Sequence, residues 1–429
     1  MKKSKSTKKQ FVKQEKPTDD ELADRWITKY PNTIHILGGF RRYGNGFWPE
    51  IHHPTVEAEI LGILEAAKQE KIRPNKGLKN SVMDLARIKT TKANERMDDN
   101  PSILVLKNGT LDLGTYELLD HDQDFYASSA LSYKYDPDAK AVNFHKILSR
   151  MSIEEVNLLQ EYAGYCLTLY TQHEISIWII GPSGSGKSAI ITAFQTLLGN
   201  MGYQLSLSDM ERSKFTLKPI VGRRLIFSTE QFTNKPTMLD NLNKIISGEP
   251  LWIEEKFEPG FTYTPHAKIL WASSDLPTIP QENGFYRRFK FISMPALPEE
   301  LRDPNLKERI KREGSGILNW ALEGLKRLDN RGYFLIPSSV KYSTEQIQGN
   351  NDHIMDFISE CCDKDSRAKE QSQPLYESYC NYCSTHGHED LSTVDFARKL
   401  ESHGFEGTKS NGRRYWHGLK LNEGKKNIY

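Results

Sequence analysis

The sequence lacks a long hydrophobic run. Its longest apolar stretch, Ile175–Ile180, is interrupted by Ser176, whereas a transmembrane helix needs about 20 mostly apolar residues. The lysine-rich N-terminus is not followed by the apolar segment that marks a secretory signal. We therefore expect a cytoplasmic protein without a membrane partner.

Cysteine is scarce as well, and neither sign of charge dominates. Five cysteines in 429 residues are an odd number, which fits a reducing compartment better than a disulfide scaffold. The 58 basic and 56 acidic residues give a formal net charge of +2, so any nucleic-acid site has to be a local patch. With 37% hydrophobic residues, the chain can form two or three globular domains.

Residues 1–18 are predicted to be a basic disordered tail. Met1–Lys16 contain seven lysines, one glutamate and little that a core could bury. Such a tail either stays solvated or touches nucleic acid, and the sequence leaves both alternatives open.

The most informative stretch is a glycine-rich loop between two apolar segments. Ile175–Ile180 has the pattern of a buried strand, and residues 189–198 repeat apolar side chains at helical spacing. A flexible linker is the alternative, but linkers are not bracketed by a strand and an amphipathic helix. The loop matches the phosphate-binding pattern G-x4-G-K-S/T, with the residues Gly181, Pro182, Ser183, Gly184, Ser185, Gly186, Lys187 and Ser188.

The residue types of this loop suit ATP and Mg²⁺. Its glycines let backbone N–H groups converge on phosphate oxygens at the start of a helix. Lys187 is expected to reach the β- and γ-phosphates, and the Ser188 hydroxyl is expected to ligate Mg²⁺. The sequence thus predicts a P-loop ATPase with ATP and Mg²⁺ as its cofactors.

Two further apolar strands are expected to end near this loop. Residues 223–230 lead through an apolar strand to Glu230, and P-loop ATPases carry an acid here that faces Mg²⁺ and the attacking water. Residues 268–274 form another strand, whose Ser274 can present a hydroxyl to the γ-phosphate. A strand-end glutamate is otherwise usually a solvated surface residue, so the hypothesis for Glu230 depends on the P-loop before it.

Arg287 and Arg288 come directly before another apolar segment, which ends at Pro295. Paired arginines most often lie at the surface or in ion pairs. The alternative here is an arginine finger, a cationic fork that stabilises charge on the transferring phosphoryl group.

The region before the P-loop is predicted to be a small α+β domain that supports or loads the next one. Asp19-Asp20-Glu21 begin a helix, and residues 56–71 have helical periodicity. Hairpins are expected over residues 43–48, with Asn-Gly at the turn, and over residues 102–113. No catalytic constellation occurs between residues 20 and 150.

The C-terminal part is predicted to be a winged helix. After an amphipathic helix over residues 317–328, the Gly/Asn/Gln-rich residues 345–351 are expected to form a linker. A helix over residues 391–400, with Ser392 or Thr393 as N-cap, precedes a basic hairpin over residues 409–416. This pattern is typical of winged helices, which bind DNA or contact other proteins. The DNA-binding candidates are Lys409, Arg413 and Arg414.

Four residues of this region are of the types that can ligate zinc. Their spacing is tighter than that of paired zinc knuckles, and the two cysteines also suit one face of a buried helix. The four are Cys380, Cys383, His386 and His388.

With these motifs, the chain resembles phage and plasmid primase-helicases, the D5-like branch of superfamily III helicases. The resemblance runs from about residue 20 to the C-terminus. It rests on the N-terminal stretch 106–113, the lead-in helix 160–167, the P-loop 181–188, the acid Glu230, the segment 244–249 with a hairpin carrying Lys256, the sensor strand 271–277, and Arg288 with Arg287 beside it.

The resemblance implies an α/β chain with a P-loop AAA+ ATPase core, an N-terminal α+β domain and a C-terminal winged-helix domain. The expected boundaries are 19–150 for the N-terminal domain, 151–345 for the ATPase and 352–429 for the winged helix. Two residues depart from the family pattern. Thr229 replaces the first of two Walker B acids, so that Glu230 serves alone, and Ser274 replaces the longer asparagine of the sensor.

The function implied is an ATP-driven DNA helicase or replication initiator of a mobile element. It would work as a ring, most simply a hexamer, and travel 3′ to 5′ with single-stranded DNA in the channel and duplex on the winged helix. Lys256 would grip DNA phosphates in the channel, and Arg288 would reach a neighbour's ATP. Only about 150 residues precede the ATPase and they hold no acidic metal triad, so primer synthesis is left to a separate primase or polymerase.

Two other classes of function remain open from the sequence. One is a DNA-binding initiator or loader in which nucleotide controls assembly without unwinding. The other is a small-molecule kinase, in which Lys256, Arg288 and the winged helix would have no purpose. DNA-stimulated ATPase separates a helicase from a kinase, and strand displacement separates it from a non-translocating initiator.

Overall fold

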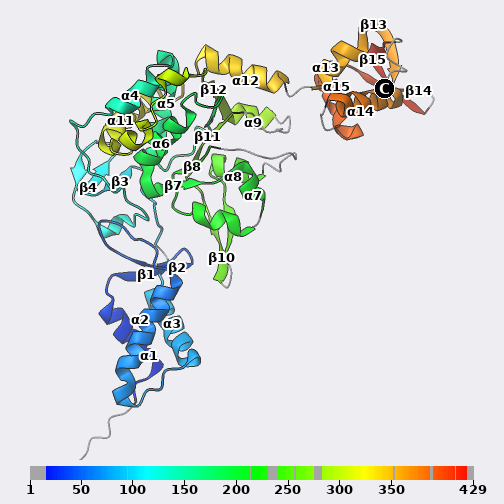
Figure 1. Cartoon of the computed structure of the whole chain (residues 1–429). Coiled ribbons are helices and arrows are strands. Elements are labelled where there is room, and N and C mark those ends of the chain that lie inside the picture. Colours follow the sequence, from blue (N-terminus) through cyan, green and yellow to red (C-terminus); the bar gives the residue numbers. More distant parts are fainter. Residues whose placement is uncertain are drawn as a thin grey trace, which may run out of the picture. The chain divides into compact units, whose positions relative to one another are not determined.

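The structure is a computed structural model of the chain. It describes residues 16–93, 95–212, 214–229, 240–255, 258–274, 283–350, 353–386, 390–410 and 412–422. The chain divides into two compact units, residues 1–277 with 287–341, and residues 278–286 with 342–429 (Figure 1). No helix in the described ranges is both long and apolar enough to cross a bilayer.

The first unit begins with three helices and a hairpin. Thr18 and Glu21 form a capping box that starts the first helix, and Trp26 is fully buried among the helices. Tight turns at Leu37-Gly38 and Asn45-Gly46 have positive φ at both central residues. The elements are α1 (Asp19–Lys29), β1 (Thr33–Ile36), β2 (Gly39–Arg42), α2 (His53–Ala66), η1 (Ala67–Glu70) and α3 (Lys76–Thr90).

A small antiparallel sheet and a short helix lead toward the P-loop. The expected hairpin over residues 102–113 is confirmed, with Leu104 opposite Leu111. Both side chains belong to the main hydrophobic core of this unit. The elements are β3 (Ile103–Leu106), β4 (Gly109–Asp112), β5 (Leu118–Leu119), η2 (Gln123–Phe125) and α4 (Val142–Leu148).

A five-stranded sheet forms the centre of the first unit. Its order is β12-β6-β11-β8-β7, and each neighbouring pair is parallel. Parallel strands buried on both faces are apolar along their whole length, and the sequence shows this in the central strands. The strands are β6 (Ser176–Ile180), β7 (Gly202–Gln204), β8 (Leu225–Ser228), β11 (Lys268–Ser273) and β12 (Phe289–Ser293).

Successive side chains of the sheet point to opposite faces. Ile177 and Ile179 join the core formed with the P-loop helix and its neighbours. Trp178 points the other way, where its ring lies 5.2 Å from Trp271 and 5.8 Å from Phe291. The sheet is therefore covered on both sides, and its strand ends alone are left to carry functional groups.

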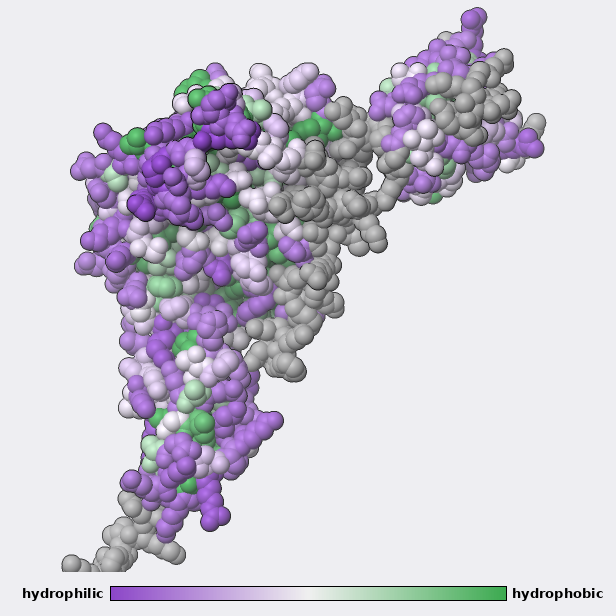
Figure 2. Space-filling view, in the orientation of Figure 1, coloured by the Kyte–Doolittle hydropathy of each residue, from purple (hydrophilic) through white to green (hydrophobic). Residues whose placement is uncertain are grey.

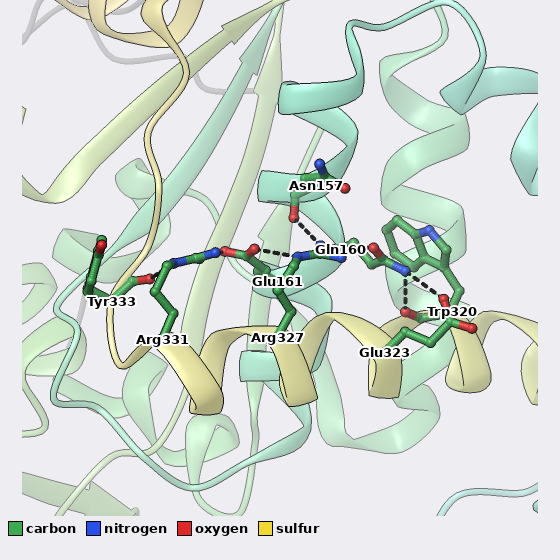
Figure 3. A network of polar contacts seen from close by, with 8 residues as sticks. All are labelled: Asn157, Gln160, Glu161, Trp320, Glu323, Arg327, Arg331 and Tyr333. Atoms are coloured by element: carbon green, nitrogen blue, oxygen red, sulfur yellow. Dashed lines mark hydrogen bonds and ion pairs between the residues drawn. The ribbon is translucent and has the colours of Figure 1, made fainter.

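Helices α5 (Ile153–Leu167) and α11 (Gly314–Arg331) pack closely beside the sheet. A Cβ atom on Gly164 would lie 2.5 Å from the Ala321 carbonyl oxygen, so only glycine permits this approach. Across the same contact, the buried carboxylate of Glu161 accepts hydrogen bonds from Arg327 and Arg331 (Figure 3). The contact fixes the helix that leads into the P-loop strand.

The remaining elements of the first unit include a hairpin and several short helices. The hairpin strands β9 and β10 pair antiparallel, with Trp252 opposite Thr262. The elements are α6 (Lys187–Leu198), η3 (Gly199–Met201), α7 (Leu207–Arg212), η4 (Lys214–Ile220), α8 (Asp240–Ser247), β9 (Leu251–Glu255), β10 (Glu258–Tyr263), η5 (Glu299–Leu301) and α10 (Leu306–Ile310).

The second unit has its own sheet, of order β13-β15-β14, and its own core. Phe357, Tyr379 and Trp416 are buried in that core. The elements are α13 (His353–Cys361), β13 (Cys362–Gln371), α14 (Ser372–His386), α15 (Thr393–Ser402), β14 (Gly407–Ser410) and β15 (Arg413–Leu421); two helices, α9 (Asn283–Arg288) and α12 (Ser338–Asn350), span the limits between the units.

One element contradicts the sequence analysis. Residues 345–350, expected to be a linker, belong to helix α12. Of the residue types there, Gly and Asn are weak helix formers, whereas Gln is a good one. Val340, near the start of the same helix, is buried in the core of the first unit. This packing anchors one end of the helix and is the physical reason that the helix continues through residues 345–350.

Hydrophilic residues predominate on the visible face of the molecule, and hydrophobic residues form small separate groups (Figure 2). Scattered exposed apolar side chains of this kind are normal for a folded chain. Functional groups are therefore expected at the strand ends and among the charged side chains.

Candidate functional site

The P-loop lies between strand β6 and helix α6, as the sequence predicts. Gly184 and Gly186 have φ of 79° and 103°, a backbone conformation that residues with a Cβ rarely adopt. Gly181 packs against the Met294 carbonyl oxygen, where a Cβ would clash. These glycines give the loop the tight curl that lets backbone N–H groups converge on an anion.

Lys187 is the first residue of α6, and its side chain is buried under the loop. Its exposed fraction is 7%. The Nζ atom donates hydrogen bonds to the carbonyl oxygens of Gly181 and Pro182, the second at 2.9 Å, and approaches Ser185 Oγ at 3.5 Å. The ammonium group is thus held inside the curl of the loop, at the N-terminal end of a helix.

Part of the loop is open to solvent. Pro182, Ser183 and Gly184 are exposed, whereas Ser185 is buried and Ser188 is partly buried in the first turn of α6. Exposed loop residues above a buried ammonium, at the start of a helix, fit the polyphosphate of ATP. The Ser188 hydroxyl fits an Mg²⁺ ion that arrives with the nucleotide.

Strand register brings Ser274 to the P-loop. Ser273 pairs with Ile180, and its carbonyl oxygen accepts a hydrogen bond from Gly181 N at 3.4 Å. The next residue, Ser274, is exposed beside the first glycine of the loop. Strand β8 ends at the same edge of the sheet, because Ser228 pairs with Trp271. Thr229 follows and is exposed.

Glu230 and Lys256 lie outside the described residues. Glu230 directly follows Thr229 in the sequence. Lys256 follows β9, whose Trp252 side chain is 59% exposed. Their predicted roles therefore stay predictions.

Two arginines that the sequence analysis did not single out lie against the P-loop. Arg150, which follows α4, donates to the Ser185 carbonyl oxygen at 2.9 Å and to the Pro295 carbonyl oxygen at 3.4 Å. Arg302, at the end of η5, lies with its guanidinium against Gly184. Neither stands near the P-loop in the sequence, so no local pattern could have found them.

Arg287 and Arg288 lie at the opposite edge of the sheet from the P-loop. They immediately precede β12, whose first residue, Phe289, pairs with Ser176 at the start of β6. Both guanidinium groups approach the Glu174 carboxylate at 3.1 Å. The two side chains differ in exposure, because Arg287 is 69% exposed and Arg288 only 14%.

The same edge also contains two buried cations. Lys268 Nζ donates to the Thr168 carbonyl oxygen at 2.7 Å, and Arg224 donates to the Leu167 carbonyl oxygen. Both therefore cap the C-terminal end of α5. Burial is the main cause that lowers the pKa of Lys268 to about 7 and that of Arg224 to about 10.

The three basic candidates of the second unit are not equivalent. Lys409 and Arg413 are exposed on strands β14 and β15. Arg414 donates to Glu401 at 2.7 Å and lies over the Trp416 ring, 4.8 Å from its centroid. The Arg414 guanidinium is thus engaged within the unit, whereas Arg413 lies opposite Ser410 at the end of the hairpin.

The cysteine and histidine candidates lie on or next to α14. Cys383 is buried in the core of the second unit, and Cys380 approaches Asp390 at 3.5 Å. His386 stacks on Tyr382 and its Nδ1 lies 2.9 Å from the Tyr382 carbonyl oxygen. His388 lies outside the described residues. Within those residues, no group of three His, Cys, Asp or Glu side chains is arranged to hold a metal ion.

The sequence matches known families over three stretches. Residues 23–153 match the family described as D5 N terminal like, and residues 349–427 match the family described as Poxvirus D5 protein-like. Two of the three matching families are thus D5-like, in agreement with the primase-helicase resemblance of the motifs. Residues 179–288 of this D5-like chain also match a family of unknown function (DUF5906).

Solved structures share the fold of this D5-like chain. The A-form apo structure of the NrS-1 C-terminal region has a TM-score of 0.51 and 10% sequence identity, over 92% of this chain and 98% of that chain. The apo structure of NrS-1 residues 305–718 has a TM-score of 0.51 and 11% identity, over 94% and 100%. No curated protein matches significantly. The family resemblance predicted from the motifs is confirmed, and the α/β core with it.

Proposed function

We propose that the D5-like chain is an ATP-dependent DNA helicase that initiates replication of a phage, plasmid or other mobile element. In this proposal the α/β unit is a superfamily III AAA+ motor. The five-stranded parallel sheet with a P-loop after a central strand supports that assignment. The matches to D5-like families support the link to replication.

The proposed ATP site uses residues at the carboxyl edge of the sheet. Lys187 and the loop N–H groups hold the phosphates, and Ser188 holds Mg²⁺. When bound, the ion would neutralise charge on the phosphates and orient them. Glu230 would activate the attacking water, and Ser274 would contact the γ-phosphate. The position of Ser274 beside Gly181 supports its part in this set.

The arrangement of Arg288 and Lys187 carries the proposal that the site is shared between copies. Strand β12 has five residues, so its first and last Cα atoms are about 13 Å apart at 3.3 Å per residue. Arg288 precedes this strand, whereas the P-loop follows β6 at the other edge. A finger at that place cannot reach the ATP of its own chain, but it can meet the P-loop of a neighbour in a ring.

We further propose that the second unit is a winged helix that binds duplex DNA. Its order of helix, strand, two helices and a two-stranded hairpin supports this. Ser392 caps α15, whose exposed side chains include Thr393 and Arg398. A capped helix beside a basic hairpin suits one groove contact and one backbone contact.

The test is strand displacement on forked DNA with ATP. Wild-type protein is expected to separate the strands and to hydrolyse ATP faster when DNA is present. Lys187→Ala is the negative control for hydrolysis, and a fork with the opposite polarity of its single-stranded arm tests the proposed 3′ to 5′ travel. DNA-stimulated hydrolysis without displacement would instead favour an initiator or loader controlled by nucleotide.

A further inference from the structure

Arg302 is an exposed arginine whose guanidinium lies against the P-loop. A Cβ atom built on Gly184 would lie 2.6 Å from Arg302 Cζ and 2.9 Å from its Nη2. The residue ends the short helix η5, where its backbone N–H bonds to the Glu299 carbonyl oxygen at 3.0 Å. The contact joins residues far apart in the sequence and brings a positive charge to the rim of the loop.

The terminal nitrogens of Arg302 have no carboxylate partner in the described part of the chain. Arg302 Nε donates to the Leu297 carbonyl oxygen at 3.1 Å. The adjacent carboxylate, Asp303, is paired with Arg309, and Arg309 also bonds to Asn143 at 3.0 Å. The local acid is therefore committed elsewhere, and the guanidinium faces an exposed glycine of the loop.

Arg150 shows what a purely structural arginine looks like at this loop. Its guanidinium donates to two carbonyl oxygens, those of Ser185 and Pro295, and so ties the P-loop to the segment after β12. Among the described residues, Arg302 makes one bond of that kind, and its outer nitrogens have no carboxylate partner. The two arginines therefore differ in what they can still bind.

We propose that Arg302 contacts the terminal phosphate of the nucleotide held by its own P-loop and distinguishes ATP from ADP. The inference rests on the proposed function, because it requires the loop to bind nucleotide. One guanidinium group can bind two phosphate oxygens through two parallel N–H donors. A γ-phosphate adds charge and acceptor oxygens beyond the cradle of the loop. Losing that phosphate removes the partner of Arg302.

The experiment measures the affinity of the full-length protein for ADP and for a non-hydrolysable ATP analogue, each with Mg²⁺, by displacement of a fluorescent nucleotide. Arg302→Ala is expected to weaken binding of the ATP analogue about tenfold to hundredfold, the range of a charge-assisted hydrogen bond. Binding of ADP is expected to change less than about threefold. Arg302→Lys should recover part of the loss, because it keeps the charge without the fork.

Arg312→Ala is the matched control, since Arg312 is an exposed arginine that follows the neighbouring helix α10. It is expected to leave both affinities unchanged. Equal loss of ATP-analogue and ADP binding in Arg302→Ala, or no loss of either, overturns the inference while the proposed ATP site stands. Absence of nucleotide binding in the folded wild type overturns both.

Discussion

The guanidinium of Arg288 lies 3.1 Å from the carboxylate of Glu174, at the edge of the sheet opposite the P-loop. Glu174 has a φ of 43°, which is uncommon for a residue with a side chain, and its carboxylate also approaches Arg287. The acid thus holds both arginines at the start of β6 and β12. Arg288 thus lies at the end of β6 opposite to the chain's own Lys187, as a shared ATP site requires.

We expect the Glu161 carboxylate to be important for stability. It is 3% exposed and accepts from Arg327 and Arg331 across the contact of α5 with α11. Removing one partner of a buried ion pair leaves charge unpaired, at a cost of about 3 to 5 kcal/mol. Because both arginines keep some exposure, we expect Glu161→Ala to lower the free energy of unfolding by about 3 kcal/mol, measured by urea denaturation.

The control is Glu154→Ala, which removes an exposed carboxylate from the first turn of the same helix. Its expected effect is about 0.5 kcal/mol, the size of a helix-dipole contribution. Equal effects of the two substitutions would mean that the buried network does not hold the helices together.

The stability of the first unit should fall in mild acid through His35. Burial, followed by the charges of Arg87 and Lys218, lowers the pKa of His35 from 6.5 to about 4. Between these values the unfolded chain takes up a proton that the folded chain does not. The free energy of unfolding therefore decreases as pH falls from 6.5 to 4. His35→Gln should flatten this dependence in urea titrations across that range; an unchanged slope would assign it to other groups.

The basic residues of the second unit should contribute unequally to duplex binding. Arg413 is exposed, whereas Arg414 is paired with Glu401. Arg413→Ala is expected to lower the slope of log affinity against log salt by about 0.9, the loss of one phosphate contact. Arg414→Ala should lower it less. Lys420→Ala, at the other end of β15, is the control. Unchanged slopes in all three would favour a protein contact for this unit.

Lys256 separates a motor from a switch. In the proposed channel it holds a DNA phosphate, so Lys256→Ala should abolish strand displacement and DNA stimulation of the ATPase while basal ATPase stays near normal. The alternative is a solvated lysine paired with a neighbouring glutamate, a contact of about 0 to 1 kcal/mol, which predicts no change. Lys244→Ala is the control, because that partly exposed lysine side chain pairs with Asp240 in α8. Normal unwinding by Lys256→Ala would remove this lysine from the motor.

Features that depend on neighbouring residues could be predicted from the sequence. The P-loop was predicted because a strand, glycines at fixed offsets and a helix follow one another. The cap of α15 at Ser392 was predicted for the same reason. The resemblance to D5-like primase-helicases followed from several such motifs in order.

Features that depend on tertiary packing could not be predicted in this way. Arg302 reaches Gly184 across more than a hundred residues, and no pattern around it differs from that of a surface arginine. The prediction of a linker over residues 345–351 was wrong, because helix α12 continues through Asn350. Helix α3 and the hairpin of β1 and β2 were not predicted, although Asn75 caps α3. The turn of that hairpin, Leu37-Gly38, lacks the usual Asn-Gly signal.

Mixing two inactive variants tests the shared ATP site most directly. Lys187→Ala removes the charge that the phosphates need, and Arg288→Ala removes a finger worth about 10³-fold or more in rate in other phosphoryl-transfer enzymes. In mixed rings, an intact P-loop from one variant meets an intact arginine from the other. We predict that ATPase activity reappears in the mixture and not in either variant alone. No recovery in subunits shown to co-assemble by native mass spectrometry would contradict a site built by two copies of the chain.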